Sequence, residues 1–230
     1  MTVITARYLY SDRTVEPLRE SLLRVGLDRH VIWLTESPDP TLRGSLARWR
    51  GYTEVLKGLP QHEPCMLCDS RDVIFQRQPD WEWRGIQAYL EKSGTLLGTS
   101  QVNFNWVAGV FGYETAYSLR FNPIVCCGVI TGHAEELRRL TKIAMRYMGG
   151  GRFSPKKEQS PTVHFQGHDQ GVLNTLIYKT FGPEVTFYPN ETGPVFHCAH
   201  SDPEELLLVD GTYIRPDGRI PCVIHQYDRL

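Results

Sequence analysis

The sequence lacks the features that mark membrane, secreted and nucleic-acid-binding proteins. No apolar stretch in its 230 residues approaches the roughly 20 residues that a helix needs to span a bilayer. The 25 basic and 26 acidic residues give a formal charge of −1, which argues against broad electrostatic capture of nucleic acid or acidic membranes. Residues 1–8 contain no basic region followed by a signal-like apolar segment. We therefore expect a cytoplasmic protein with no membrane span and no nucleic-acid partner.

Cysteine is too sparse for a disulfide-stabilised scaffold, with six residues in the chain. Cys65 and Cys68 form a CxxC pair, but both lie inside an expected strand. Because thiol chemistry needs an exposed, electropositive setting, we do not favour a redox or zinc role for this pair. Cys126 and Cys127 lie in another apolar run and are expected to be small buried side chains. The His-Cys-Ala-His segment at 197–200 lacks a matching second pair of zinc ligands.

The first part of the chain alternates between strand and helix patterns. Strands are expected at 3–8, 30–34 and 65–68, and helices at 14–25 and 40–59. Alternation of this kind is typical of a mainly parallel α/β sheet, and the chain length fits one domain. We therefore predict an α/β fold in which helices flank a mixed, mainly parallel sheet, within a single domain over 1–230.

The second part of the chain is less regular. We expect a helix at 86–91, strands at 95–99 and 124–130, helices at 133–148 and 169–180, and short strands and turns after residue 180. Residues 101–123 combine the signals of strand, loop and short helix. Residues 149–168 contain three consecutive glycines and two Ser-Pro pairs, which predict a long mobile loop of the kind that often acts as a lid.

The most informative stretch is the sequence Cys-Met-Leu-Cys-Asp-Ser-Arg-Asp-Val-Ile-Phe-Gln at 65–76. Its apolar run ends at Asp69, and Asp72 follows after Ser70 and Arg71. Carboxylates at the carboxyl end of a buried strand lie where open α/β sheets bind ligands, and Mg²⁺ and Mn²⁺ prefer such oxygen ligands. A capped turn, in which Asp69 accepts backbone hydrogen bonds and Arg71 pairs with Asp72, would use the same residues. The residues alone leave both interpretations open.

Three further segments place polar groups among apolar neighbours. Gly128 interrupts the strand expected at 124–130, where it could admit a close approach to the backbone or form a bulge. Asp169 and Gln170 stand at a helix start, where Asp169 could cap the helix or point into a cleft. His225 ends an apolar strand. Its imidazole could ligate a metal beside carboxylates, or it could fix the end of the chain by a hydrogen bond.

These segments, in this order, resemble a metal-dependent glycosyltransferase with the GT-A fold. The string Asp-Ser-Arg-Asp-Val-Ile-Phe-Gln carries most of the resemblance, together with a Gly-Val-Ile strand, an Asp-Gln helix start and a late histidine. A more distant resemblance is to the glycogenin-like retaining enzymes. The family implies a GT-A (Rossmann-like) sheet. It also implies transfer of a sugar from a nucleoside-diphosphate donor, UDP in preference to GDP, to a hydroxyl acceptor such as a glycan or small molecule, with retention favoured.

The resemblance also implies a Mn²⁺ or Mg²⁺ site beside the donor diphosphate. Asp72 corresponds to the second acid of the family's Asp-x-Asp motif, whereas either Ser70 or Asp69 supplies the first position. His225 resembles the late histidine that completes the metal site in glycogenin-like enzymes. We expect Asp72 and His225 to bind the ion, and Asp69 to contact the ion, a metal-bound water or the donor sugar.

Other residues take their expected roles from the same resemblance. Asp169 and Gln170 match the Asp-Gln pair near the acceptor and the reacting carbon. Asp169 would be the general base if the enzyme inverts, and the pair would orient the acceptor if it retains. Cys127 and Gly128 lie where relatives usually have Asn-Ser-Gly or Asn-Ala-Gly beside the sugar. The candidate donor-binding residues are Thr5, Arg7, Tyr8, Arg48, Asp69, Ser70, Arg71 and Gly128.

Two other functions remain open at this point. In a metal-dependent phosphoesterase or hydrolase, Asp69, Asp72, His168, Asp169 and His225 would gather around two ions. Such a site usually needs more acidic ligands than the sequence offers. In a non-catalytic protein, the GT-A scaffold would serve only to bind a nucleotide. Activity towards nucleotide sugars would distinguish a glycosyltransferase from the phosphoesterase or hydrolase. Metal-dependent binding of a nucleotide without turnover would indicate the non-catalytic protein.

Overall fold

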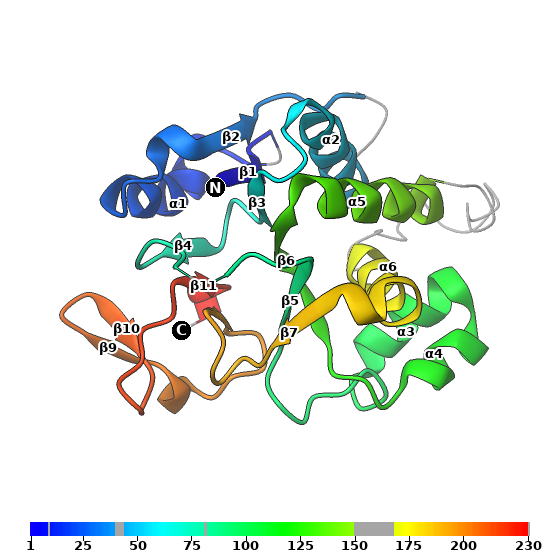
Figure 1. Ribbon diagram of the computed structural model, residues 1–230. Coiled ribbons are helices and arrows are strands. Elements are labelled where there is room, and N and C mark those ends of the chain that lie inside the picture. The colour runs from blue at the N-terminus through cyan, green and yellow to red at the C-terminus, as the bar shows by residue number, and fades with distance from the viewer. Residues whose placement is uncertain (9, 40–43, 81, 150–167, 230) are drawn as a thin grey trace.

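The computed structural model describes residues 1–8, 10–39, 44–80, 82–149 and 168–229. At its centre is a six-stranded sheet in the order β2-β1-β3-β6-β5-β7 (Figure 1). Its strands are β1 (Thr2–Ala6), β2 (Val31–Leu34), β3 (Pro64–Cys68), β5 (Ile86–Leu90), β6 (Val125–His133) and β7 (Val185–Tyr188). β1 pairs in parallel with β2 and β3, and β5 pairs in parallel with β7, whereas β6 runs antiparallel to both its neighbours. The predicted mixed, mainly parallel sheet is therefore confirmed.

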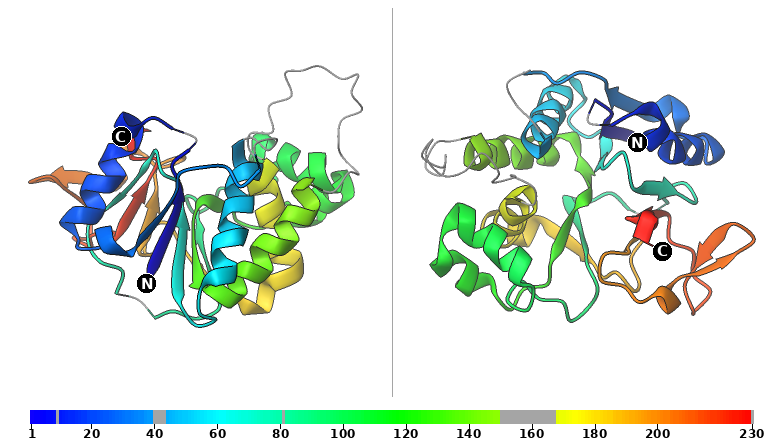
Figure 2. Two further views of the ribbon diagram at one scale, coloured as in Figure 1. Left: turned by 90° about the horizontal axis from the view of Figure 1, so that it is seen from above. Right: turned by 180° about the vertical axis from the view of Figure 1, so that it is seen from behind.

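Helices cover both faces of this sheet (Figure 2). The helices are α1 (Asp12–Arg24), α2 (Gly44–Gly58), α3 (Gln101–Phe111), α4 (Tyr113–Leu119), α5 (Ala134–Gly149) and α6 (His168–Leu176), which continues into a π-helical turn (Ile177–Phe181). α1 packs on one face, while α2, α5 and α6 pack on the other. None of the described helices is both long enough and apolar enough to cross a membrane.

The central strand β3 shows why its sequence is a continuous apolar run. Successive side chains of a strand point to opposite faces. Cys65 and Leu67 accordingly join the core under α2, α5 and α6, while Met66 and Cys68 join the core under α1. Because both faces of the sheet are covered, the strand does not alternate between apolar and polar residues. The first carboxylate, that of Asp69, therefore follows only at the end of the strand, where its side chain is partly exposed.

A small three-stranded sheet packs beside α1 and carries the last strand of the chain. It consists of β4 (Val73–Phe75), β8 (Val195–His197) and β11 (Val223–His225), in the order β4-β11-β8. β11 runs antiparallel to β4 and parallel to β8, so His225 lies opposite both Val73 and His197. The hairpin of β9 (Leu207–Val209) and β10 (Thr212–Ile214) lies outside both sheets.

The predicted elements of the first part of the chain are confirmed to within a few residues where the structure describes them. Residues 40–43 of the helix expected at 40–59 lie outside the described residues. Two later predictions are wrong. The helix expected at 86–91 is the strand β5, which is buried between β6 and β7. A short apolar run does not distinguish helix from strand by its periodicity. The strand expected at 95–99 is a turn with one bridge, Leu96 to Pro123, and Gly98 packs tightly against Arg120.

Residues 101–123, where mixed signals were expected, are mainly helical, with α3 and α4 separated by Gly112. Ser100 caps α3 by accepting a hydrogen bond from the backbone of Asn103. The mobile loop predicted at 149–168 falls largely on 150–167, which lie outside the described residues. The short strands and turns expected after residue 180 are present.

Candidate functional site

The two sheets bring the acidic motif and the last strand together. Asp69 directly follows β3, and its backbone N–H donates to the Gly128 carbonyl of β6 at 2.9 Å. Asp72 directly precedes β4, and its carbonyl accepts a hydrogen bond from the backbone of Gln226 at 2.6 Å. Because β4 pairs with β11, this arrangement places His225 beside both aspartates.

His225, Asp69 and Asp72 form a compact group of potential metal ligands. His225 Nε2 lies 3.5 Å from Asp69 Oδ2 and 3.7 Å from Asp72 Oδ1, and one ligand atom from each residue falls within a 4.8 Å spread. Asp72 and His225 are buried, and His225 Nε2 has no hydrogen-bond partner among the described residues. Buried polar atoms normally have a partner. An ion held between the imidazole and the two carboxylates would satisfy this nitrogen.

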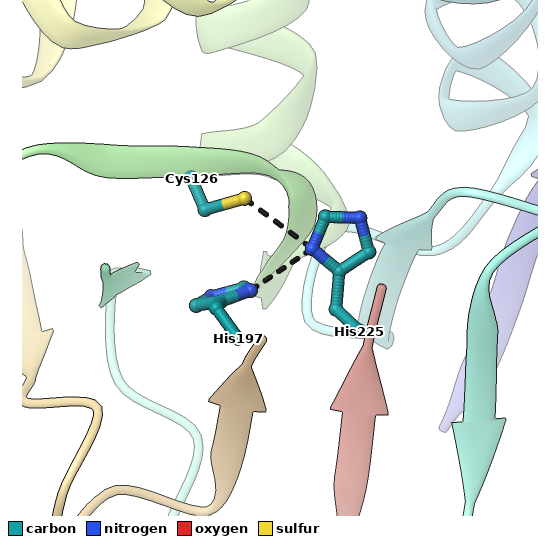
Figure 3. Close-up of side chains that lie close together, drawn as sticks. All are labelled: Cys126, His197 and His225. Carbon is teal, nitrogen blue, oxygen red and sulfur yellow. Dashed lines mark hydrogen bonds between the residues drawn. The ribbon is translucent and has the colours of Figure 1, made fainter. Parts of the chain in front are cut away.

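The other ring nitrogen of His225 faces a second pair of side chains (Figure 3). His225 Nδ1 lies 3.0 Å from His197 Nδ1 and 3.3 Å from Cys126 Sγ. Burial and the neighbouring His225 lower the pKa of His197 well below its ordinary value. Burial lowers the pKa of His225, but Cys126, Asp72 and Glu91 raise it to a net value above the ordinary one. When His225 Nδ1–H donates to His197, Nε2 keeps its lone pair for a metal.

Gly128 is explained by the close approach of this histidine. A Cβ atom at position 128 would lie 2.2 Å from both Cε1 and Nε2 of His225, a separation that real side chains do not tolerate. The glycine in an otherwise apolar strand therefore makes room for the imidazole. A direct contact between Gly128 and a donor stays a prediction.

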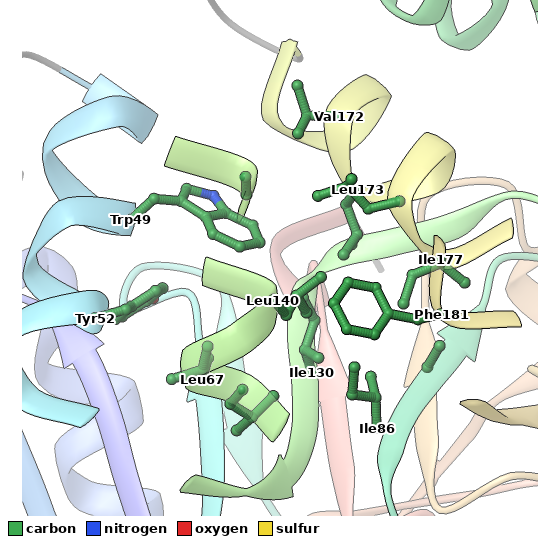
Figure 4. Close-up of a cluster of buried hydrophobic side chains, with 14 of the residues drawn as sticks. Trp49, Tyr52, Leu67, Ile86, Ile130, Leu140, Val172, Leu173, Ile177 and Phe181 are labelled. Carbon is green, nitrogen blue, oxygen red and sulfur yellow. The ribbon is translucent and has the colours of Figure 1, made fainter. Parts of the chain in front are cut away.

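Arg48 links the acidic motif to the start of α6. Its Nη1 contacts Asp69 Oδ1, and its Nη2 donates to Asp169 Oδ2 at 2.7 Å. α2 holds Arg48 in place because the adjacent Trp49 and nearby Tyr52 are buried in the core against the sheet (Figure 4). Burial lowers the pKa of Arg48, but Tyr52 and Asp169 raise it to a net value above the ordinary one. One guanidinium thus pairs with two carboxylates that are distant in the sequence.

Gln170 is held by hydrogen bonds within the protein. Its Oε1 accepts from the backbone N–H of Cys127 at 3.2 Å, and its Nε2 donates to Glu91 Oε1 at 3.0 Å and Asn103 Oδ1 at 2.7 Å. The other Glu91 oxygen lies 3.2 Å from His200 Nε2 and raises the pKa of that histidine. Both amide hydrogens of Gln170 are therefore used to position it between α3 and β6.

Three predicted donor-binding residues of β1 and the acidic motif use their polar groups elsewhere. The Thr5 hydroxyl donates to the carbonyl at the end of β3 at 2.9 Å, and the Ser70 hydroxyl donates to the Ala6 carbonyl at 2.8 Å. Arg7 Nε donates to Asp12 Oδ1 at 3.0 Å. The two hydroxyls hold the strand ends together, and Arg7 pairs with the start of α1. Their contact with a donor stays a prediction.

Of the remaining two predicted donor-binding residues, Tyr8 lies near Arg48 and Arg71 lies beside Asp72. Burial raises the pKa of Tyr8 to about 12, although the nearby Arg48 lowers it. Arg71 Nη2 lies 3.3 Å from Asp72 Oδ2 and 3.6 Å from Asp228 Oδ2. About half of the Arg71 side chain is exposed, so it can reach a ligand in solvent. The structure thus brings together Tyr8, Arg48, Asp69, Arg71, Asp72, Gly128, Asp169 and His225.

Four residues at this site were not predicted from the sequence as site residues: Glu91, Asn103, Cys126 and His197. Glu91 carries a usable signal, because it follows the buried strand β5 as Asp69 follows β3. The assignment of 86–91 to a helix hid that signal. Cys126 has no local signal, and the segment around His197 lacks a second ligand pair in the sequence. The two side chains meet only through the packing of β6 against the small sheet.

Comparison with known proteins identifies the fold. No protein-family model and no curated protein matches this sequence. Among solved structures, the chain is similar to a glycosyltransferase involved in the glycosylation of the major capsid of PBCV-1, with a TM-score of 0.55 and 11% sequence identity. The match covers 98% of this chain and 93% of that one. The α/β fold is therefore one that a glycosyltransferase adopts.

Proposed function

We propose that this protein is a metal-dependent glycosyltransferase that moves a sugar from a UDP-sugar donor to a hydroxyl acceptor. The observation that carries the proposal is the convergence of Asp69, Asp72 and His225, whose Nε2 has no hydrogen-bond partner within the described part of the chain. The group lies at the carboxyl end of β3, on a fold that a known glycosyltransferase shares. Ligands in open α/β sheets bind at the carboxyl ends of the strands.

The side chains fit a hard divalent cation. Two carboxylates and one imidazole suit Mn²⁺, and the carboxylates also suit Mg²⁺. We assign Asp72 and His225 as ligands, and Asp69 as a further ligand or as the partner of a metal-bound water. When bound, such an ion would stabilise the negative charge that develops on the departing diphosphate.

Arginine side chains would share in stabilising that charge. Arg71 reaches solvent beside Asp72, so it can exchange its ion pair with Asp228 for one with a donor phosphate. Arg48 stays behind the carboxylates and keeps Asp69 in place. Preorganised positive groups of this kind stabilise charge that appears only in the transition state.

The surroundings of Asp169 favour retention over inversion. Its Oδ2 accepts a hydrogen bond from Arg48, and its Oδ1 accepts one from the backbone of Gln170 at 3.1 Å. Since both oxygens are engaged and the side chain is only 5% exposed, Asp169 is poorly placed to remove a proton from an acceptor. We assign Asp169 and Gln170 the task of shaping the pocket in which the acceptor is oriented.

Metal removal tests this proposal without knowledge of the acceptor. The melting temperature would be measured with UDP, GDP, CMP and their common sugar conjugates, each in the presence of Mn²⁺ or EDTA. A ligand at 100 times its Kd stabilises the fold by about 2.7 kcal/mol, which corresponds to about 5–10 °C for a chain of this size. We expect such a shift with UDP conjugates and Mn²⁺, and its loss in EDTA. A chain that no nucleotide stabilises would contradict the proposal.

A further inference from the structure

We propose that Cys126, His197 and His225 form a zinc site that is distinct from the carboxylate site but shares His225 with it. The three side chains come from three different strands, β6, β8 and β11. All three are buried. Their potential ligand atoms lie within 4.8 Å of one another.

The distances between these atoms are close to those of a tetrahedral zinc site. With Zn–N bonds of about 2.0–2.1 Å and a Zn–S bond of about 2.3 Å, tetrahedral angles place two nitrogens about 3.3 Å apart and a nitrogen and a sulfur about 3.6 Å apart. His225 Nδ1 lies 3.0 Å from His197 Nδ1 and 3.3 Å from Cys126 Sγ. The ring planes of the two histidines cross at 89° (Figure 3). Expansion by a few tenths of an ångström would therefore admit the ion.

The chemistry of the ligands separates this site from the carboxylate site. A thiolate with two imidazoles selects Zn²⁺ over Mg²⁺, which prefers carboxylates and water. Zinc binding would release the Cys126 thiol proton to solvent. The His225 proton would move from Nδ1 to Nε2, because Nδ1 must give its lone pair to the metal. The resulting Nε2–H would face Asp69 and Asp72, its nearest carboxylates at 3.5 and 3.7 Å.

This proton shift would make zinc an inhibitor, a consequence that rests on the proposed function. A protonated Nε2 has no lone pair, so His225 would no longer ligate the ion at Asp69 and Asp72. Inhibition through Cys126 differs from simple replacement of Mn²⁺ by Zn²⁺. Replacement would occur equally in a variant without the cysteine, whereas inhibition through Cys126 would not.

Cobalt spectroscopy tests the site directly, because Co²⁺ bound to a thiolate gives a near-ultraviolet charge-transfer band. The full chain would be titrated with Co²⁺ without added Mg²⁺ or Mn²⁺, because Co²⁺ at the carboxylate site has no thiolate ligand and gives no such band. We expect the band in the wild-type protein and its removal by added Zn²⁺. Cys126→Ser should lose the band, and His197→Gln should weaken Co²⁺ binding by about tenfold or more. Cys65→Ser, at another buried cysteine, is the matched control and should keep it.

The Asp72→Asn variant separates this proposal from the proposed function. It should keep the cobalt band, since Asp72 is outside the thiolate site, even if no nucleotide binds to the protein. Circular dichroism establishes that each variant is folded, and His197→Gln decides the matter if Cys126→Ser does not fold. Absence of the band in the folded wild-type protein, or its persistence in folded Cys126→Ser, would overturn the zinc site.

Discussion

Replacing Asp72 by asparagine is expected to weaken Mn²⁺-dependent binding of UDP by at least about 100-fold. Loss of an outer partner of a metal ligand typically costs 10–100-fold, and loss of a direct ligand charge should cost no less. Asparagine keeps the size of the side chain, and the Asp72 contact with Gln226 is made by the backbone. We therefore expect the free energy of unfolding to change by only about 1 kcal/mol. Calorimetric titration of UDP with Mn²⁺ measures the effect.

Asp228→Asn is the matched control for this variant. Asp228 lies 3.6 Å from the same arginine, Arg71, but its side chain is 42% exposed, and it does not belong to the ligand group at His225. Its replacement should leave UDP binding within about twofold, since exposed ion pairs contribute little. Equal UDP affinities of the Asp72→Asn and wild-type proteins would remove Asp72 from the metal site.

Replacing Gly128 by alanine is expected to destabilise the protein by about 2–3 kcal/mol, because overpacking a filled interior usually costs this much. The added Cβ would lie 2.2 Å from the His225 ring. The imidazole cannot turn aside easily, since it is buried and lies against Cys126 and His197, and the backbone of Gly128 is held in the paired strand β6. The melting temperature should fall by about 4–12 °C. Displacement of the imidazole should also weaken Mn²⁺ binding, which titration of the folded variant would detect.

Gly58→Ala provides the comparison for Gly128→Ala. Gly58 is the last residue of α2, and a Cβ atom there would meet nothing within 4 Å. Alanine is favoured over glycine in helices, so this variant should be neutral or up to about 1 kcal/mol more stable. If Gly128→Ala unfolds at the same temperature as Gly58→Ala, the packing of His225 against β6 is wrong.

The sequence predicts the fold best where an element carries its own periodic pattern. α1 and α2 bury regularly spaced apolar residues, and β3 is a continuous apolar run covered on both faces. The prediction fails for β5 because its apolar run is equally compatible with a helix. Only its position between β6 and β7 makes it a strand.

The sequence identified those residues of the candidate site that lie at the ends of strands. Asp69 and His225 each follow or close an apolar run, so each could be identified locally. Their proximity could not be predicted from the local sequence, because it depends on the pairing of β11 with β4. The same holds for the contacts of Cys126 with His225 and of Gln170 with Glu91, which join residues 99 and 79 positions apart.

Product analysis tests the proposed sugar transfer most directly. The protein would be incubated with Mn²⁺ and the UDP-sugar that stabilises it most, with an EDTA reaction as control, and the nucleotide products would be separated by ion-exchange chromatography. A glycosyltransferase breaks the bond between the sugar and the diphosphate, and water takes the place of the acceptor hydroxyl in this reaction. We therefore predict UDP and free sugar, formed only with Mn²⁺ and lost in Asp72→Asn. Formation of UMP and a sugar phosphate would instead identify a phosphoesterase and contradict the proposed function.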